Sequence, residues 1–391
     1  MTQPLRGLFV LDLSRVLSGP YCTMNLGDLG AEVVKVEEPQ KGDDTRAFGP
    51  PFVHGESTYF LSINRNKRSL AVDLKSGEGQ ALVQRLAEQA DVLVENFRPG
   101  VAARLGLAPQ RLREKNPRLI YCSISGFGAQ SQLPGYDAIV QGLSGLQHVT
   151  GQPDGPPTRI GVPISDLLSG LAAFQAILAA LYTREKSGEG AYLDLSMLDA
   201  TAAVLTFHSS SALNAGTTPR RLGNRHASIA PYETFAASDG YFNVAVGNDA
   251  QFQSLCEELG LSPLAKDARF VTNPERVRNR DALSAVLSQA FQQKTAKQWV
   301  ARLSEAGIPV GEILDVNQVV EHPELLARGK RIEVQHPTAG ALRFIGSPLP
   351  QTRNNHLPPP KLGEHTREVL SRRLSLSGEA IDRLISSGVV R

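Results

Sequence analysis

Short apolar runs alternate with helix-length segments through the first half of the chain. Runs of this kind, bounded by charged residues or by Gly and Pro, predict buried strands. The strands that we expect are 8–13, 31–37, 69–74, 91–95 and 118–125. Helices are expected after Gly19-Pro20 and over 77–89. Strands separated by helices predict right-handed βαβ units and a mostly parallel sheet.

A longer apolar segment, 167–184, is rich in Ala and Leu and predicts a buried helix. The stretch before it contains Pro163 and places Asp166 where the helix begins. Free N–H groups in the first turn of a helix favour an anionic side chain, so a carboxylate fixed there could serve as a nucleophile. The alternative is a plain N-cap, because Asp is a preferred N-cap residue.

The pattern changes in the second half of the chain. A strand over 192–196 and a helix over 197–213 lead to a hairpin over 232–246, which turns at Asp239-Gly240. The expected fold is α/β: a large Rossmann-like domain with a smaller α+β domain. The domain ranges that we expect are 1–213, completed by 335–391, for the large domain, 225–334 for the small domain, and 214–224 and 351–361 for the linkers.

Composition excludes several classes of protein. A net charge of +2 argues against proteins that bind nucleic acid or membrane surfaces, which usually have a strong basic excess. The three cysteines are far apart and show no metal-ligand spacing, so we expect no metal site and a reduced, cytoplasmic setting. The start, MTQPLRG, has no apolar segment typical of a signal peptide. The apolar stretch 171–182 is too short to span a bilayer.

The common cofactor and hydrolase motifs are missing from the sequence. It has no P-loop, no H-E-x-x-H and no G-x-S-x-G, and the glycine-rich run 126–131 lacks a third glycine. We therefore expect no tightly bound cofactor.

Two basic segments border strands of the predicted sheet. In 94–106, Asn96, Arg98 and Arg104 follow a strand, at the edge where parallel sheets bind ligands. Backbone N–H groups and guanidinium groups of such a turn suit phosphate oxygens. The basic residues of the other segment, 64–75, are Arg65, Lys67, Arg68 and Lys75. The alternative for both segments is a solvated loop, because surface Lys and Arg are common.

Other segments join these in a recognisable order. They are 10–35 (VLDLSRVLSGPYCTMNLGDLGAEVVK), 64–75, 94–106, 123–128 (SISGFG), 135–137, Asp166, 186–200 (KSGEGAYLDLSMLDA), 246–252 (VGNDAQF) and 362–366 (LGEHT). Taken together, they resemble the class III CoA-transferases of the CaiB/BaiF family over essentially the whole chain. Each segment alone is weak, but their order and spacing are specific.

The resemblance implies a covalent mechanism with Asp166 as the nucleophile. Its carboxylate would attack a donor acyl-CoA to give a mixed anhydride, and CoA thiolate would convert this to an aspartyl-CoA thioester. An acceptor carboxylate would then take the CoA through a second anhydride. No metal or redox cofactor takes part, and acyl-CoA is a substrate.

The resemblance also implies which residues surround CoA. They are Val16, Val72, Leu74, Lys75, Asn96, Phe97, Arg98, Val101 and Arg104, with Tyr136 and Asp137 at the thioester end. Lys75 and Arg104 are the best candidates for phosphate contacts.

Two departures from formyl-CoA transferase bear on the substrate. Leu17 stands where that enzyme has a glutamine that contacts reacting groups. The run 223–232 (GNRHASIAPY) replaces its glycine-rich lid and is closer to members that act on succinyl-CoA and other short dicarboxylates. Arg225 and His226 could pair with the far carboxylate of such an acceptor, and a loop Arg and His without a ligand is the alternative.

Two other functions compete with CoA transfer. α-Methylacyl-CoA racemase shares the fold, but it uses a His-Asp pair where this chain has Tyr136-Asp137, and Tyr is a poor base near neutral pH. A CoA-binding protein without catalysis is the other alternative. The family also forms interlocked homodimers, so we expect a homodimer, with no nucleic-acid or membrane partner.

Overall fold

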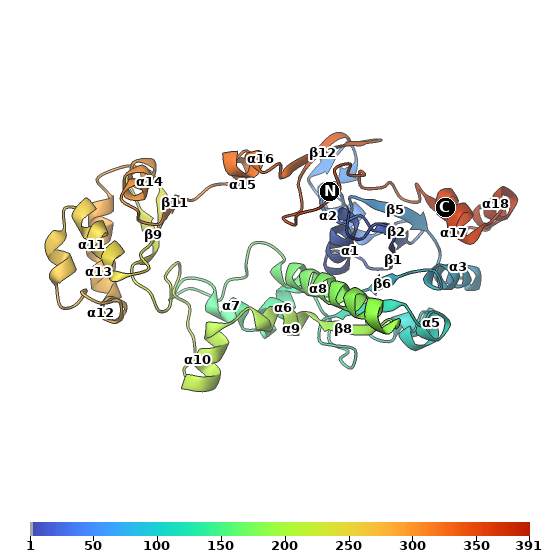
Figure 1. Cartoon of the computed structure of the whole chain (residues 1–391), viewed down its shortest axis with the longest axis horizontal. Coiled ribbons are helices and arrows are strands. Elements are labelled where there is room, and N and C mark those ends of the chain that lie inside the picture. Colours follow the sequence, from blue (N-terminus) through green and yellow to red (C-terminus); the bar gives the residue numbers. More distant parts are fainter. Residues whose placement is uncertain (1–2) are drawn as a thin grey trace. The chain divides into compact units, whose positions relative to one another are not determined.

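The computed structural model describes residues 3–391. Its largest element is a six-stranded parallel sheet in the order β5-β2-β1-β6-β7-β8 (Figure 1). The strands are β1 (Phe9–Asp12), β2 (Glu32–Glu37), β5 (Lys67–Ala71), β6 (Val92–Glu95), β7 (Ile120–Ser125) and β8 (Tyr192–Ser196). The predicted α/β class and parallel sheet are confirmed. The third predicted strand begins two residues earlier than expected, at Lys67.

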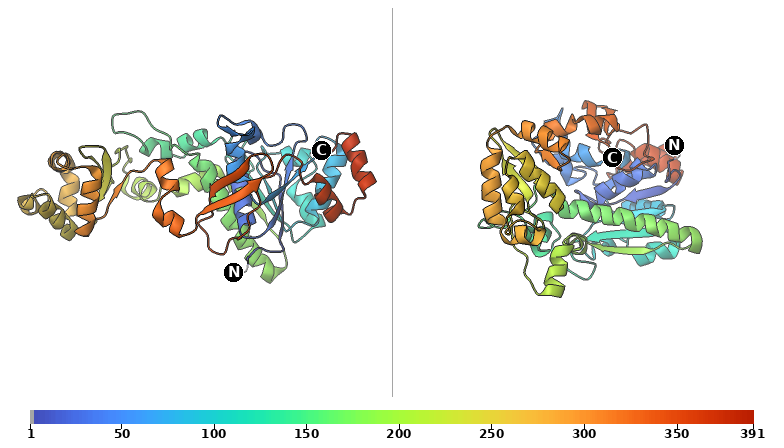
Figure 2. Two further views of the ribbon diagram at one scale, coloured as in Figure 1. Left: turned by 90° about the horizontal axis from the view of Figure 1, so that it is seen from above. Right: turned by 60° about the vertical axis from the view of Figure 1, so that its left-hand side comes forward.

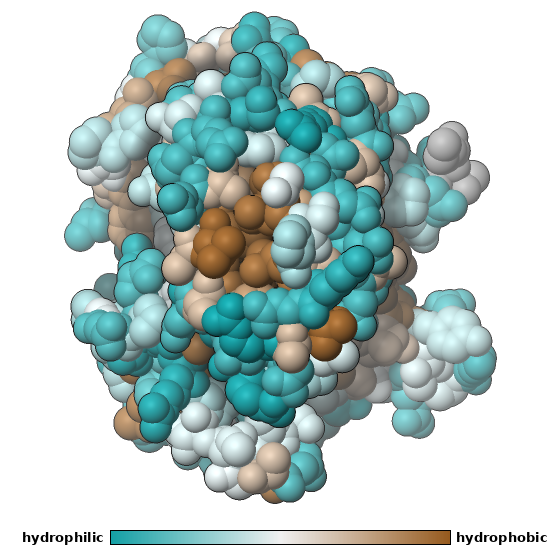
Figure 3. Space-filling model, turned by 90° about the vertical axis from the view of Figure 1, so that its left-hand side faces the viewer, coloured by the Kyte–Doolittle hydropathy of each residue, from teal (hydrophilic) through white to brown (hydrophobic). Residues whose placement is uncertain are grey.

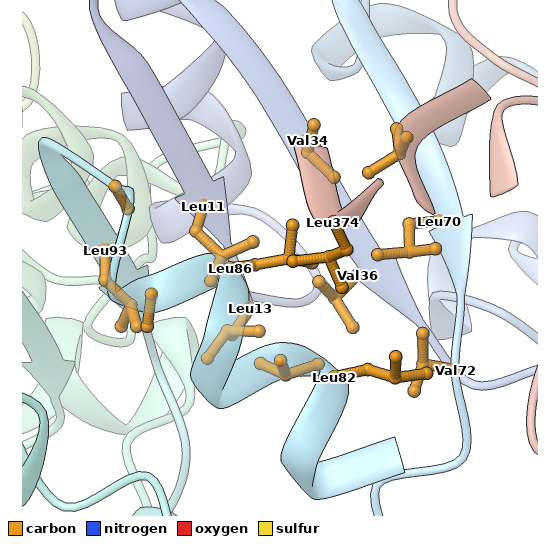
Figure 4. Close-up of a cluster of buried hydrophobic side chains, with 14 of the residues drawn as sticks. Leu11, Leu13, Val34, Val36, Leu70, Val72, Leu82, Leu86, Leu93 and Leu374 are labelled. Atoms are coloured by element: carbon orange, nitrogen blue, oxygen red, sulfur yellow. The ribbon is translucent and has the colours of Figure 1, made fainter. Parts of the chain in front are cut away.

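Helices cover both faces of this sheet. Alternate residues of a strand point to opposite faces, so Leu11 and Leu13 face one side and Val10 the other. The first side packs against α3 (Gly77–Ala87), α17 (Thr366–Leu374) and α18 (Gly378–Ser386), and Figure 4 shows Leu82, Leu86 and Leu374 meeting the strands there. Because both faces are buried, the strands read as continuous apolar runs.

The second face packs against α1 (Ser18–Asp28) and α8 (Ile164–Ser187). Figure 2 shows α8 lying along the sheet. Its length and hydropathy alone would suit a membrane span, but Ala173, Phe174 and Ile177 are buried in the core beside α1. Arg184, near the far end of α8, is also buried and donates to the carbonyls of Asp91 and Arg118. This anchors the helix where β6 and β7 begin.

The chain divides into two compact units. The large unit comprises the residues up to Leu146 together with Ile160–Ser209 and Pro323–Arg391, and the small unit comprises Gln147–Arg159 and Ser210–His322. The other elements of the large unit are β3 (Phe52–Val53), β4 (Glu56–Ser57), α2 (Thr58–Ile63), α4 (Val101–Arg104), α5 (Pro109–Lys115), α6 (Asp137–Leu143), α9 (Met197–Ala203), α16 (Pro323–Ala327), β12 (Arg331–His336), β13 (Gly340–Ile345) and a 3-10 turn (Asp44–Ala47).

The small unit has an antiparallel sheet in the order β11-β10-β9. The predicted hairpin is present, and Ala237 N–H donates to Gly240 O at 2.8 Å across its turn. Phe235, Phe242, Phe291 and Trp299 form the core of this unit. Its elements are β9 (Tyr232–Ala236), β10 (Tyr241–Ala245), β11 (Val310–Glu312), α11 (Asp249–Glu258), α12 (Asn273–Arg278), α13 (Arg280–Phe291), α14 (Ala296–Glu305), α15 (Val316–Val320) and a 3-10 turn (Ser262–Lys266), while α7 (Leu146–Val149) and α10 (Phe207–Ala215) lie at its boundaries.

Two details differ from the pattern expected from the sequence. β12 was expected within a small domain ending at 334, but Val334 and Leu342 pack against Leu61, which groups this ribbon with the large unit. The single helix expected over 197–213 is two helices, because Thr206 adopts a left-handed φ of 40° that an α-helix does not accommodate.

Candidate active site

The loop after β1 carries an unusual backbone conformation. Val16 has a φ of 65°, and a β-branched residue rarely adopts this left-handed region. Its N–H donates to Asp43 Oδ1 at 3.3 Å. In this strand order the chain leaves β1 and the adjacent β6 toward opposite sides, and such a point is where doubly wound sheets bind ligands. Strain of this kind persists where neighbouring groups hold it, commonly at functional sites.

Asn96, directly after β6, holds this loop from the other side. Its Oδ1 accepts the N–H of Arg15 at 2.8 Å, and its Nδ2 donates to the Arg15 carbonyl at 2.7 Å. Asn96 was expected to contact CoA, and in the structure its side chain fixes the backbone of the loop that carries Val16.

A buried ion pair also stabilises this loop. Lys35 Nζ lies 2.8 Å from Asp43 Oδ2 and donates to the Ser14 carbonyl at 2.8 Å. Burial opposes the ionisation of Asp43, but the Lys35 charge and bonds from Thr45 outweigh it and lower the pKa of Asp43 to about 2. The loop is thus tied to charged groups that water does not reach.

A pocket of about 280 Å³ opens beside these loops at the carboxyl edge of the sheet. Five residues expected to line a CoA site do line it: Val72, Leu74, Lys75, Phe97 and Val101. Leu13, Val36 and Leu105 add apolar surface. The charged residues of the lining are of both signs: Arg15, Lys35 and Lys75, with Glu37, Glu38, Asp43 and Asp73. An apolar pocket with basic groups suits a ligand that joins a ring to phosphates.

Asp166 lies in the first turn of α8. The helix begins at Ile164 after Pro163, so Asp166 is the third helical residue and not the N-cap. Asp137, the first residue of α6, lies beside it and accepts the Ser165 N–H at 2.9 Å. Burial, with a smaller contribution from the Asp137 charge, raises the pKa of Asp166 to about 7. A carboxyl shifted this far from its usual 3.8 is a candidate for chemistry.

Comparison with known proteins identifies this arrangement. The model of CoA-transferase family III matches residues 5–366. The chain belongs to CoA-transferase family III. It is 43% identical to mouse succinyl-CoA:glutarate CoA-transferase over 99% of this chain and 90% of the relative. It is 44% identical to acetyl-CoA:oxalate CoA-transferase of Acetobacter aceti, with 88% of each chain covered.

Solved structures agree with this assignment. A CaiB/BaiF family protein from Brucella suis superimposes with a TM-score of 0.86 at 41% identity, covering 95% of this chain and all of that one. Rv3272 from Mycobacterium tuberculosis gives 0.82 at 33% identity, covering 93% and 98%. The predicted family is confirmed, and the chain is a transferase that acts on CoA thioesters.

The remaining predicted residues of this family III chain lie in different settings. Arg98 lines a smaller neighbouring pocket of about 120 Å³, and Arg98 and Arg104 are both exposed. Tyr136 is 65% exposed, whereas Leu17 is buried at the start of α1. These positions leave the arginines and Tyr136 accessible to a ligand.

The second basic segment is divided between the protein interior and the pocket. Arg65 is buried and forms a two-pronged pair with Asp28, and Lys67 is buried 3.0 Å from Asp12. Burial, opposed by Asp12, lowers the pKa of Lys67 to about 8. Arg65 and Lys67 thus form ion pairs inside the protein. Lys75 is the basic residue of the segment that lines the pocket.

Tyr59 is a site residue that sequence reasoning missed. It lies on α2, half-buried, and its ring packs edge-on against Phe48 with centroids 5.5 Å apart. Burial, together with the charges of Asp166, Asp137 and Asp43, raises the pKa of Tyr59 to about 12. Its phenol therefore stays protonated beside the two carboxyl groups. A tyrosine in a short helix gives no signal in sequence that sets it apart.

Arg225 and His226 lie in the small unit. Arg225 pairs with Glu233 at 3.1 Å and with Asp281 at 2.6 Å. Arg280 donates to the carbonyls of His226 and Ala227, at 3.1 and 2.9 Å. The segment is therefore held to its own unit by charged side chains, and a role in substrate binding remains a prediction.

The described residues 3–391 contain no group of three or more His, Cys, Asp or Glu arranged to hold a metal ion.

Proposed function

We propose that this enzyme moves CoA from an acyl-CoA such as succinyl-CoA to a short dicarboxylic acid. One observation carries the proposal: Asp166 lies half-buried in the first turn of α8, next to Asp137, with a pKa raised to about 7, in the same unit as a pocket that suits CoA. Relatives support the substrate class, since three of them are named for glutarate, oxalate and mesaconate transfer.

The reaction proceeds through four balanced steps at one carboxylate. An Asp166 oxygen attacks the donor thioester carbonyl and expels CoA thiolate, which leaves a mixed anhydride. The thiolate attacks the aspartyl carbonyl and releases the donor acid as its carboxylate, which leaves an aspartyl thioester. The acceptor carboxylate attacks this thioester and expels thiolate again. The thiolate then attacks the acceptor carbonyl, which releases acceptor-CoA and restores the Asp166 carboxylate. Covalent catalysis divides one difficult exchange into easier ones.

The position of Asp166 suits these steps. The first N–H groups of α8 have no partner within the helix and favour negative charge close by. Such groups stabilise the oxyanion that forms at each attack. The raised pKa also indicates a carboxylate that is poorly solvated and therefore reactive.

CoA occupies the pocket between the loops after β1 and β6. Its adenosine part lies against Val72, Leu74, Phe97 and Val101, and its phosphates meet Lys75 and Arg104. The supports for this placement are the lining of the pocket and the exposure of both basic side chains. The thioester end then runs toward Tyr136, Asp137 and Asp166.

The enzyme works as a homodimer, interlocked as the family resemblance implies, and in the cytoplasm. Support for a dimer comes from apolar surface. Only 39% of the most apolar stretch of α8 is buried, and Leu213 is 84% exposed. Figure 3 shows apolar side chains gathered on the face of the small unit, ringed by hydrophilic ones. Contiguous exposed apolar patches ringed by polar residues are typical of interfaces. A monomer in light scattering would contradict the dimer.

Trapping tests the reaction. The protein is incubated with succinyl-CoA and hydroxylamine and then weighed by mass spectrometry. A hydroxamate at Asp166 is expected. An unmodified Asp166 with exchange of the α-proton would instead indicate a racemase, and an unmodified protein without exchange would indicate a CoA-binding protein.

A further inference from the structure

Helix α6 holds the chain segment that leads to the nucleophile. Asp137 and Gln141 are four residues apart on α6, so they share one face of the helix. Asp137 Oδ1 accepts the N–H of Ser165 at 2.9 Å. Gln141 Oε1 accepts the N–H of Ile160 at 2.9 Å. The two side chains thus grip both ends of the segment 160–165, directly before Asp166.

A third bond joins the two side chains to each other. Gln141 Nε2 donates to Asp137 Oδ2 at 2.8 Å. The chemistry allows one orientation of this amide, because a carboxylate can only accept and the Ile160 N–H can only donate. Gln141 is fully buried, so a bond lost here is not replaced by water, and each broken bond leaves an unsatisfied polar group.

We propose that Asp137 and Gln141 are positioning residues for Asp166: together they fix the segment before the nucleophile, and the negative charge of Asp137 acts on the nucleophile in addition to its burial. The inference deepens the proposed function and rests on the role of Asp166 in it. It gives Asp137 a task distinct from the contact with the thioester end of CoA that the family resemblance implies.

The electrostatic part follows from the groups that face Asp166. Asp137 approaches from α6 and Tyr59 from α2, and Tyr59 is in turn influenced by Asp43. Tyr59 stays protonated, whereas the charge of Asp137 acts on Asp166 and adds to the effect of burial. A like charge favours the protonated form of its neighbour. Moving this charge away should therefore lower the pH at which Asp166 ionises.

An exchange of donor and acceptor separates geometry from charge. Asp137→Asn alone sets two donors against each other, either at Gln141 or at Ser165, so one bond is lost. In the double variant Asp137→Asn/Gln141→Glu, the new amide donates to the new carboxylate, whose second oxygen still accepts from Ile160. All three bonds return, and the negative charge lies one hydrogen bond further from Ser165. Gln141→Met removes two bonds without adding charge.

The rate of Asp166 acylation by succinyl-CoA is measured from pH 5 to pH 9 by hydroxylamine trapping, with CoA affinity and thermal unfolding recorded for each variant. Asp137→Asn and Gln141→Met are expected to slow acylation by about tenfold to a hundredfold, with KM for succinyl-CoA little changed, because small misplacements of a nucleophile are costly. The double variant should regain most of that loss at high pH, with its pH midpoint below that of the natural protein. Gln89→Met, an exposed glutamine on the opposite face of the sheet, is the control and should change neither.

Each outcome bears on the inference. A double variant no faster than Asp137→Asn would overturn the geometric part, and an unchanged pH midpoint would overturn the electrostatic part. If Gln141→Met fails to fold, the double variant still decides both. Absence of acylation in the natural protein would instead remove the proposed function, which is a distinguishable result.

Discussion

The side-chain amide of Asn96 bonds to both backbone groups of Arg15, at 2.8 and 2.7 Å, and so joins the ends of two adjacent strands. The joined loop carries Val16, whose left-handed conformation costs energy that these bonds help to offset. We therefore expect CoA affinity to depend on Asn96, although its hydrogen bonds go to the protein itself.

Asn96→Ala should weaken CoA binding by about tenfold or more, because two bonds worth about 1 kcal/mol each are lost from the loop. Isothermal titration with CoA measures the change. Asn116→Ala is the matched control, since Asn116 Nδ2 also makes two bonds to backbone carbonyls, at 3.1 and 2.8 Å, away from the pocket. It should cost similar stability but leave CoA affinity unchanged. Equal CoA affinities for the two variants would show that the Asn96 hydrogen bonds have no role in binding.

Asp166→Ala should abolish transfer and leave CoA binding nearly intact, since the variant removes the nucleophile without touching the pocket. Turnover and CoA titration are measured together. Asp199→Ala is the control, because Asp199 is also the third residue of its helix, α9, but is exposed. It should keep normal turnover. Residual transfer by Asp166→Ala above a small fraction of the natural rate would remove Asp166 from its role.

The raised pKa of Asp166 makes the stability of the folded protein depend on pH. Its folded pKa of about 7 exceeds the usual 3.8, so the folded protein holds this proton more tightly than the unfolded chain. The resulting stabilisation is complete below pH 3.8 and is lost as the pH rises through 7. The Asp166→Asn variant lacks this loss. Its melting temperature relative to the natural protein should rise between pH 4 and pH 7 and stay level above. A constant difference would contradict a raised pKa.

Lys35→Met should lower the free energy of unfolding by about 3–5 kcal/mol, because it leaves Asp43 buried without its partner. Both side chains are almost completely buried, at 1% and 2% exposure. The double variant Lys35→Met/Asp43→Asn should recover part of the loss, and urea unfolding measures both. A loss under about 1 kcal/mol for the single variant would place this pair with ordinary surface ion pairs.

The parallel sheet was predictable because its strands are buried on both faces and so read as apolar runs. The start of β5 was not, because Lys67 opens this strand with a charge that becomes acceptable in the interior through Asp12 and the Pro20 carbonyl, both distant in sequence, and through Asn64. For the same reason the sequence offered a ligand-binding loop or a solvated loop for Arg65 and Lys67, whereas both are buried. A lone sequence shows a charge but not its partner.

The active site was predictable in part. Five residues expected from the family resemblance do line the pocket, while the roles of Asp166 and of the basic turn after β6 stay predictions. Tyr59 and Gln141 were not expected, because neither residue type is unusual in a helix and their importance comes from neighbours that only folding supplies. The helix start at Ile164 was also missed, since Pro163 caps α8 without the side-chain bond that a polar N-cap would provide.

The hydrogen bonds of Arg184 fix the position of α8 along its own axis. From Asp166 to Arg184 the helix spans about 27 Å, at about 1.5 Å per residue. One end carries Asp166, the proposed nucleophile, and the other is held at the opposite edge of the sheet by hydrogen bonds from Arg184 to the carbonyls of Asp91 and Arg118. The position of Asp166 therefore depends on contacts at the end of α8 that is remote from the pocket. Mutations at that end would shift Asp166 and lower activity without altering a residue of the pocket.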